Sequence, residues 1–398
     1  MPTGACSTVW GSASPVNATD LESWLRQRRA QGLYRHREVV EGPQGAEVVV
    51  EGRRLVNFCS NDYLGLANHP DVVLAWQRGA ERYGVGSGAS HLICGHLRPH
   101  HQLEEELAEF TGRERALLFS TGYQANLGVI SALTEPGDRV YQDRLNHASL
   151  LDGARLAGAR LRRYPHGDTA VLSRWLARQP AALIATDGVF SMDGDLAPLP
   201  RLAELAKAHR AWLHVDDAHG FGVLGPDGSG TVAHYRLDQE QVPVLMATLG
   251  KAVGVFGAFV AGDRALIETL IQKTRTYIYT TALPPAAAQA VRASLGLIRR
   301  QSWRREYLKH LIERFRQGAR ELNLPLLPSA TPVQPLVVGD SQAAVTLARK
   351  LRAQGFWVAP IRPPTVPRGS ARLRITLTAD HREEQVERLL TALARCLV

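Results

Sequence analysis

The chain has 398 residues, of which 45% are hydrophobic and 21% are charged, as expected for a globular protein of two or three domains. Its formal net charge is +9, but the Lys and Arg residues are dispersed along helical stretches without interleaved aromatic residues, so we expect no nucleic-acid partner. No uncharged apolar run approaches the length of about 18 residues that a membrane-spanning helix needs. We therefore expect no membrane span.

The first 20 residues, MPTGACSTVWGSASPVNATD, contain no Lys or Arg and no apolar core segment. This composition excludes a standard secretory signal and predicts a flexible tail over residues 1–20. No C-x-x-C pair exists among the four cysteines, so we predict reduced thiols, a cytoplasmic location and no metal site.

Residues 21–58 predict an N-terminal segment made of a basic amphipathic helix, LESWLRQRRAQGLY, and a short β-hairpin. The first arm of the hairpin is REVVEG. The chain then turns around Pro43 and Gly45 into a second arm, AEVVVEGRRLVNF.

Residues 59–295 alternate apolar runs of strand length with helical patterns. The runs are RALLFS, RVYQD, LRRYP, AALIATDG, AWLHVDDA, VPVLMATLG and GAFVAG. Between two of them, LPRLAELAKAHR places Leu199, Leu202 and Leu205 on one helical face. Short buried strands that alternate with helices indicate βαβ units, so we predict an α/β fold with a mostly parallel sheet.

From residue 296 to residue 398 the pattern changes to that of a smaller C-terminal α/β domain. A long helical stretch, RREYLKHLIERFRQGARELN, is followed by the strand-like runs QPLVVG, FWVAPI and ARLRITLT. The stretch REEQVERLLTALARCL predicts a final helix.

One lysine, Lys251, lies in the otherwise small and apolar stretch ATLGKAVGVFG. In a doubly wound sheet, chemistry collects at the carboxyl ends of the strands. The polar residues at predicted strand ends are Asp187, Ser191, Asp216, Asp217, His219, Thr248 and Lys251. A surface lysine in a glycine-rich loop is the simpler interpretation of Lys251 taken alone. Beside a carboxylate and an imidazole, however, a buried lysine has a lowered pKa and suits Schiff-base chemistry.

A second stretch, STGYQAN at residues 120–126, lies between the strand-like ALLF and the helix-like LGVISAL. Backbone N–H groups at such a turn can bind a phosphate. Many glycine-containing turns between a strand and a helix look similar, so this feature is weak evidence by itself.

These residues resemble the α-oxoamine synthase family of fold type I enzymes, which use pyridoxal 5′-phosphate (PLP). The resemblance runs from residue 21 to the C-terminus. It rests on the motifs NFCSNDYLGLANHP, DRLNHASLLDGARLAGA, TDGVFSMDGDLAPLP, VDDAHGFGVLG, TLGKAVG, YIYTT and IRPPTVPRGSARLRITLTA. It implies a transferase whose large domain holds a mostly parallel seven-stranded sheet between helices, followed by a smaller C-terminal α/β domain.

The resemblance implies a PLP site around Lys251, which would form the Schiff base and move protons at the substrate α carbon. Asp216 would pair with the pyridine nitrogen, and His219 would hydrogen-bond the ring hydroxyl. His147 would stack on the ring and assist the reaction. The other implied cofactor-binding residues are Gly122, Tyr123, Ser191, Thr248, Thr280 and Thr281. Of these, the two adjacent threonines would reach the phosphate of the other subunit in a homodimer.

The resemblance also implies a substrate site, formed by Arg35, Asn61, His147, Thr365 and Arg374. Arg374 is the candidate for the amino-acid carboxylate, because a guanidinium can bind a carboxylate through two parallel hydrogen bonds. The plainer alternative is a structural ion pair, both for Arg374 and for Arg35 in its basic helix.

Within the family, the motifs are most similar to the members that join L-alanine to a pimeloyl thioester of coenzyme A or an acyl carrier protein, in biotin biosynthesis. The nearest alternative is a sister synthase that uses glycine or serine. A catalytically silent subunit of the same fold would be expected to lack Lys251. A PLP-dependent DNA-binding regulator would need a helix-turn-helix segment, which the first 20 residues cannot supply.

Overall fold

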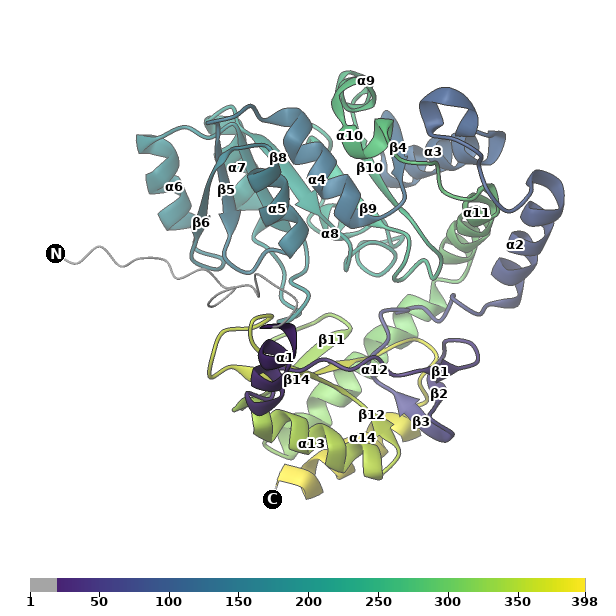
Figure 1. Cartoon of the computed structure of the whole chain (residues 1–398), viewed down its shortest axis with the longest axis vertical. Helices are drawn as coiled ribbons and strands as arrows, with labels where there is room; N and C mark the ends of the chain where they lie inside the picture. The colour runs from purple at the N-terminus through teal and green to yellow at the C-terminus, as the bar shows by residue number, and fades with distance from the viewer. Residues whose placement is uncertain (1–19, 398) are drawn as a thin grey trace.

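The computed structural model describes residues 20–397, so the predicted tail, apart from Asp20, lies outside the described residues. The main element is a seven-stranded sheet with the strand order β4-β10-β9-β8-β7-β5-β6 (Figure 1). Pairing is parallel from β9 through β6, and it is antiparallel only where β10 meets β4 and β9. The prediction of an α/β fold with a mostly parallel sheet of seven strands is therefore confirmed.

Each strand of this sheet coincides with one of the predicted apolar runs. The strands are β4 (Arg115–Phe119), β5 (Arg139–Asp143), β6 (Arg160–Tyr164), β7 (Leu183–Asp187), β8 (Trp212–Asp216), β9 (Val244–Thr248) and β10 (Ala258–Gly262). Successive side chains of a strand point to opposite faces of the sheet. In β7, Leu183 and Ala185 accordingly join one apolar cluster while Ile184 joins another, so the strand is buried on both sides.

Helices cover both faces of the sheet. One face packs against α4 (Gly122–Leu133), α5 (Ala148–Leu156) and α9 (Arg264–Lys273). The other face packs against α3 (Arg98–Thr111), α6 (Thr169–Arg178), α7 (Leu199–Ala208) and α11 (Pro285–Arg300). The helix predicted from the spacing of Leu199, Leu202 and Leu205 is α7, and all three leucines are buried.

Shorter or peripheral elements complete this part of the molecule. They are α2 (Pro70–Tyr83), the π-helical turn η2 (His91–Gly95), α8 (Thr231–His234) and α10 (Arg275–Ile278). Helix α2 packs along α11. None of the helices between residues 20 and 397 is both long and apolar enough to cross a lipid bilayer.

The C-terminal residues form the second, smaller group of elements, in the lower half of Figure 1. A three-stranded antiparallel sheet has the order β11-β14-β13. Its strands are β11 (Val333–Gly339), β13 (Ala359–Ile361) and β14 (Ala371–Thr376), and its helices are α12 (Trp303–Glu321), α13 (Ser341–Ala353) and α14 (Glu383–Leu397).

The N-terminal segment contains α1 (Leu21–Ala30) and a sheet that also takes in a strand from the C-terminal part. The sheet has the order β1-β2-β3-β12. Its strands are β1 (Val40–Glu41), β2 (Glu47–Val50), β3 (Arg53–Asn57) and β12 (Phe356–Trp357). Strand β3 pairs in parallel with β12. The domain boundaries at residues 58/59 and 295/296 stay predictions.

Two sequence-based predictions in these segments are wrong in detail. The second arm of the hairpin is not one strand, because Glu51 and Gly52 have φ angles of 49° and 74° and turn the chain between β2 and β3. The run FWVAPI is also divided, since β12 pairs with β3 whereas β13 pairs with β14.

Candidate active site

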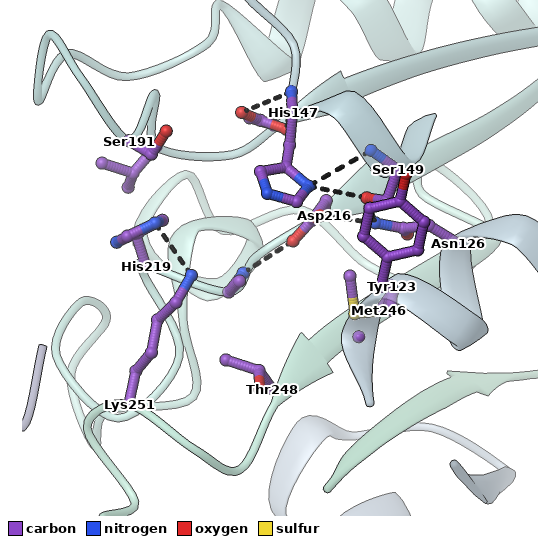
Figure 2. A pocket seen from close by; sticks show the side chains of 14 residues that line it. Tyr123, Asn126, His147, Ser149, Ser191, Asp216, His219, Met246, Thr248 and Lys251 are labelled. Carbon is purple, nitrogen blue, oxygen red and sulfur yellow. Dashed lines mark hydrogen bonds between the residues drawn. The ribbon is translucent and has the colours of Figure 1, made fainter. Parts of the chain in front are cut away.

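A cavity of about 200 Å³ opens at the carboxyl ends of β7, β8 and β9 (Figure 2). Ligands of doubly wound folds bind at this edge of the sheet. The lining residues are Gly122, Tyr123, Asn126, His147, Ser149, Asp187, Val189, Ser191, Asp216, Ala218, His219, Met246, Thr248 and Lys251. All the sequence-predicted cofactor residues except Thr280 and Thr281 are therefore brought together in one cavity.

Lys251 lies in the loop after β9, and its Nζ is 2.8 Å from Nε2 of His219. The neighbouring Gly254 has a φ of 75°, and a Cβ there would lie only 2.5 Å from the backbone nitrogen of Ala67. The loop can therefore pack against the backbone of the NDYLGLA segment. Burial lowers the pKa of the Lys251 amine to about 8, although nearby Asp216 opposes the shift. A share of the amine is thus uncharged and nucleophilic at neutral pH.

Asp216 and Asp217 are adjacent in sequence, but their carboxylates have different hydrogen-bond partners. Oδ2 of Asp216 accepts a hydrogen bond from Nδ2 of Asn126 at 2.7 Å, and its Oδ1 accepts one from the backbone N–H of Ala218 at 3.0 Å. Asp217 instead accepts hydrogen bonds from the backbone N–H and the hydroxyl of Thr231. Asp216 therefore lines the cavity, whereas Asp217 anchors the start of α8.

His147 precedes α5 and caps its first turn. Its Nδ1 accepts a hydrogen bond from the backbone N–H of Ser149 at 3.3 Å and lies 2.7 Å from Oγ of the same residue. The backbone N–H of His147 donates to both carboxylate oxygens of Asp187, each at 3.2 Å. The ring reaches solvent at the mouth of the cavity, yet the surrounding protein desolvates it and lowers its pKa. The fixed ring is thus uncharged at neutral pH.

Sequence analysis missed Tyr63, which lies in the motif NFCSNDYLGLANHP. Its side chain is fully buried, and its hydroxyl lies 2.5 Å from Nδ1 of His219. Burial first, and then the charges of Lys251 and Arg374, lower the pKa of His219 well below its ordinary value. Tyr63, His219 and Lys251 therefore form a continuous chain of polar atoms. The tyrosine directly after the polar pair Asn61 and Asp62 was the available sign of this role.

Asn126 and Ser149 were also missed. Nδ2 of Asn126 donates to Oγ of Ser149 at 2.8 Å as well as to Asp216, and its Oδ1 accepts from Nε2 of His214 at 2.8 Å. Through Ser149 the chain of hydrogen bonds continues to His147 (Figure 2). The imidazole at the mouth and the carboxylate within the cavity are therefore held by one network.

Helix α4 begins at the edge of the cavity with Gly122, and Thr121 caps it by accepting the backbone N–H of Gln124 at 3.2 Å. The first turn of an α-helix has N–H groups without partners inside the helix, and its positive end favours an anion. This end of α4 can therefore bind a phosphate, as its position after β4 predicts.

The predicted substrate residues are only partly gathered. Arg374, on β14, is buried beside the cavity, and its Nε donates to the Ser191 carbonyl at 2.6 Å. Its Nη2 donates to Oδ1 of Asn61 at 3.1 Å. Nη2 of Arg35 donates to Oγ1 of Thr365 at 3.4 Å, and neither of these two residues lines the cavity.

Thr280 and Thr281 follow α10 and do not line the cavity of their own chain. The backbone of Thr281 instead forms an isolated antiparallel bridge with Ser90. Within one chain, the structure therefore does not bring these two hydroxyls to Lys251.

The chain is similar to known proteins over most of its length. Residues 53–393 match the family model of class I and II aminotransferases. The 8-amino-7-oxononanoate synthase of Nitrosococcus oceani is 63% identical over 375 residues, which cover 94% of this chain and 100% of that protein. The Pseudomonas putida protein of the same name is 62% identical over 380 residues, which cover 95% of this chain and 97% of that protein. A structure of serine palmitoyltransferase from S. paucimobilis with a bound PLP–myriocin aldimine has a TM-score of 0.89 and 29% identity, and it covers 94% of this chain and 96% of that one.

Proposed function

The chain belongs to the class I and II aminotransferase family, where it groups with the 8-amino-7-oxononanoate synthases and uses PLP, and we propose that it joins L-alanine to a pimeloyl thioester. The products are 8-amino-7-oxononanoate, CO2 and the free thiol carrier. The observation that carries the proposal is the Lys251 amine, which has a lowered pKa and lies 2.8 Å from the His219 imidazole in a cavity that also holds Asp216.

The chemistry of the cavity residues fits PLP. The cavity offers an amine for the aldehyde, a carboxylate for the pyridine nitrogen and a helix N-terminus for the phosphate. When bound, PLP supplies an electron sink that stabilises negative charge at the substrate α carbon. The residues proposed to hold it are Gly122, Tyr123, His147, Ser191, Asp216, His219, Thr248 and Lys251.

Lys251 is the proposed base that takes the α proton of alanine. A pKa of about 8 leaves part of the amine uncharged near neutral pH. A general base is most effective when its pKa lies near the pH at which it works. His219 lies against the amine on one side and against the Tyr63 hydroxyl on the other, which keeps its ring in one orientation. His147 is proposed to act at the mouth of the cavity, where its ring is fixed by Ser149.

Arg374 is proposed to bind the carboxylate of alanine. The Ser191 carbonyl and Oδ1 of Asn61 orient its guanidinium through Nε and Nη2. An arginine has five N–H donors, so this arrangement leaves a further N–H group for a substrate carboxylate.

The test of the reaction uses the purified chain with pimeloyl thioesters of coenzyme A and of acyl carrier protein. Each thioester is incubated with alanine, glycine or serine, and the products are identified by mass. We expect alanine to give the condensed product with loss of CO2 at the highest rate. A faster reaction with glycine or serine would replace this proposal with the corresponding sister synthase, and the two thioesters show which carrier is preferred.

We further propose that the enzyme is a homodimer whose sites are completed across a two-fold axis by Thr280 and Thr281. Support comes from their position outside the cavity of their own chain. A two-fold interface is reciprocal, so one such reach implies a second. Mixing the Lys251→Ala variant with a Thr280→Ala/Thr281→Ala variant should restore activity. In each mixed dimer, one of the two sites then combines an intact Lys251 from one chain with intact threonines from the other. No rescue, with subunit exchange confirmed by mass, rejects the shared site.

A further inference from the structure

Four histidines and a buried glutamate gather where the chain enters α3, and none of them lines the cavity of Figure 2. They are His91, His96, His100, His101 and Glu104. One ligand-type atom from each of His96, His101 and Glu104 lies within 4.8 Å of the other two. Cysteine spacing, on which the prediction of no metal site rests, is uninformative about a cluster of this kind.

Glu104 is the carboxyl member of the cluster. Its Oε1 accepts the backbone N–H of Leu118 at 2.9 Å, while Oε2 faces Nε2 of His96 at 3.9 Å. Between residues 20 and 397, His96 is the one basic group within 4 Å of this carboxylate. Burial raises the pKa of Glu104 to about 8. A buried carboxylate is costly to ionise unless a cation accompanies it, so a metal ion here would offset that cost.

His96 can present a lone pair toward Glu104. Its Nδ1 lies 2.9 Å from Nδ1 of His91, so one of the two nitrogens carries a proton and donates a hydrogen bond to the other. When His96 donates, its Nε2 is unprotonated, as in metal-binding histidines that donate their other N–H to a neighbour. Burial lowers the pKa of His91 to about 3 and of His96 to about 4, so both rings are uncharged at neutral pH.

His101 supplies the third ligand, and His100 does not. His101 and Glu104 are three residues apart on α3, so they share one face of the helix. The His101 side chain is about half exposed, and its Nε2 lies 3.4 Å from a carboxylate oxygen of the exposed Glu105. Both nitrogens of His100 are already used, because Nε2 bonds the Leu283 carbonyl at 2.8 Å and Nδ1 accepts the backbone N–H of Leu97 at 3.0 Å.

We propose that His96, His101 and Glu104 bind a divalent transition-metal ion of the Zn²⁺ class, and that His91 orients His96. Two imidazoles and one carboxylate are a common Zn²⁺ ligand set, which leaves a coordination position for water. With metal–ligand distances of about 2.0–2.1 Å, neighbouring ligand atoms lie roughly 3.3 Å apart, so the 3.9 Å between His96 and Glu104 closes with a small movement. The ion would connect the turn before α3 with the helix itself. Through the hydrogen bond between Glu104 and Leu118, it would also connect both with β4.

The test is a titration of the untagged, chelator-treated, PLP-loaded chain with Zn²⁺ and with Co²⁺ by calorimetry. We expect one ion per chain, and at least about tenfold weaker binding in His96→Ala, His101→Ala and Glu104→Gln. His91→Phe should weaken binding by about 10–100-fold, because it removes only the orienting partner.

The matched control is His310→Ala. His310 is an exposed histidine whose Nε2 lies 3.0 Å from a carboxylate oxygen of Glu383, but it has no third ligand-type neighbour among the residues from 20 to 397. Its replacement should leave the affinity unchanged. Absence of saturable binding, or an unchanged affinity in His101→Ala, overturns the site; His101 is half exposed, so this variant is expected to fold.

Discussion

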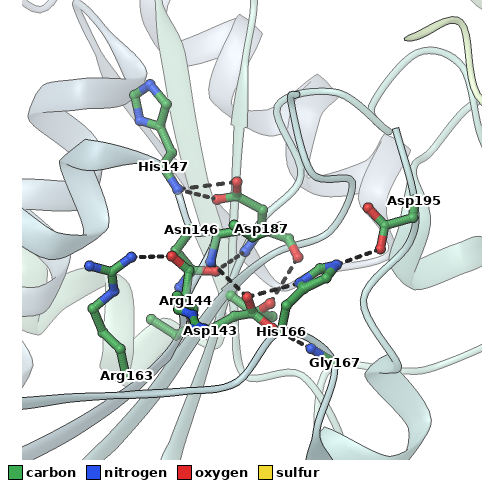
Figure 3. A network of polar contacts seen from close by, with 12 residues as sticks. Asp143, Arg144, Asn146, His147, Arg163, His166, Gly167, Asp187 and Asp195 are labelled. Carbon is green, nitrogen blue, oxygen red and sulfur yellow. Dashed lines mark hydrogen bonds and ion pairs between the residues drawn. The ribbon is translucent and has the colours of Figure 1, made fainter. Parts of the chain in front are cut away.

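Two groups of polar side chains at the same edge of the large sheet differ in the charge of their histidines, which are uncharged in one group and charged in the other. In the cavity, burial lowers the pKa of His219 and of His147 (Figure 2). Near β5 and β6, His166 lies between Asp143, at 3.0 Å from Nδ1, and Asp195, at 2.8 Å from Nε2 (Figure 3). Burial alone would lower the pKa of His166, but the two carboxylates outweigh it and raise that pKa to about 10.

The difference follows from what each group of side chains has to do. A reaction centre needs imidazole and amine lone pairs, and desolvation favours them by lowering the pKa of each group. His166 instead joins three segments, because Asp143 also accepts the backbone N–H groups of Leu145 and Gly167, and Asp195 lies in the loop that carries Ser191. A charged histidine therefore fixes the frame around the cavity, whereas uncharged histidines line the cavity itself.

Lys251→Ala disrupts the cavity group most severely. We expect turnover of alanine and the pimeloyl thioester to fall by at least about 10²–10⁴-fold, the usual contribution of one acid–base group. Borohydride reduction of the parent protein followed by peptide mapping should place the cofactor label on Lys251. A label on Lys207 or Lys273 contradicts the assignment. Lys273→Ala is the matched control, since its exposed ammonium pairs with Glu135 at 3.0 Å and its loss should leave turnover unchanged.

Arg374→Ala sharpens the comparison by removing a buried cation whose charge lowers the pKa of His219. A hydrogen bond to a charged group contributes about 1.5–3 kcal/mol, so alanine affinity should weaken by about ten- to a hundredfold. The measurement is a spectral titration of the cofactor with alanine. Arg35→Ala serves as the control, because Arg35 does not line the cavity and should not affect alanine affinity. Unchanged alanine affinity in a folded Arg374→Ala removes Arg374 from the substrate site.

Tyr63→Phe tests whether the Tyr63 hydroxyl orients the uncharged His219 ring. The variant deletes the hydroxyl 2.5 Å from Nδ1 of His219. A hydrogen bond between neutral groups is worth about 0.5–1.5 kcal/mol, so kcat should fall by up to about tenfold and its pH profile should shift. Tyr141→Phe is the control, since it removes a similar hydroxyl, 2.9 Å from the Gln179 carbonyl, outside the cavity lining. Equal kcat losses in both variants would reduce Tyr63 to a purely structural role.

His166→Asn has the smallest expected effect, and that effect is on the free energy of unfolding. The pKa of His166 is about 10 in the folded chain and 6.5 in its unperturbed state, so its contribution is complete below pH 6.5 and is lost as the pH rises toward 10. Because solvent screens this partly exposed histidine, we expect a contribution of about 0–1 kcal/mol. The unfolding midpoint of the parent should therefore fall more than that of the variant between pH 6.5 and pH 10. Parallel pH curves would show that His166 is not a charged clamp.

The parts that sequence predicted correctly depend on local patterns. Strand β7 is buried along its whole length, and burial on both faces requires the continuous hydrophobicity that the sequence shows directly. Asp216 is the last residue of β8, and Lys251 lies three residues after the end of β9. Tyr63 was missed because its partner His219 is 156 positions away, and no local pattern records such a contact. The roles of Thr280 and Thr281 stay predictions, because their predicted ligand lies in a second copy of the chain.

The pairing of β3 with β12 has a consequence for synthesis of the protein. Val56 is paired with Phe356, so one edge of the N-terminal sheet stays open on the ribosome until nearly the whole chain has been translated. An unpaired strand edge is a template for intermolecular pairing, and contacts this distant in sequence form slowly. A nascent or truncated chain that ends before residue 356 therefore carries an aggregation-prone edge although its Lys251 loop is already complete.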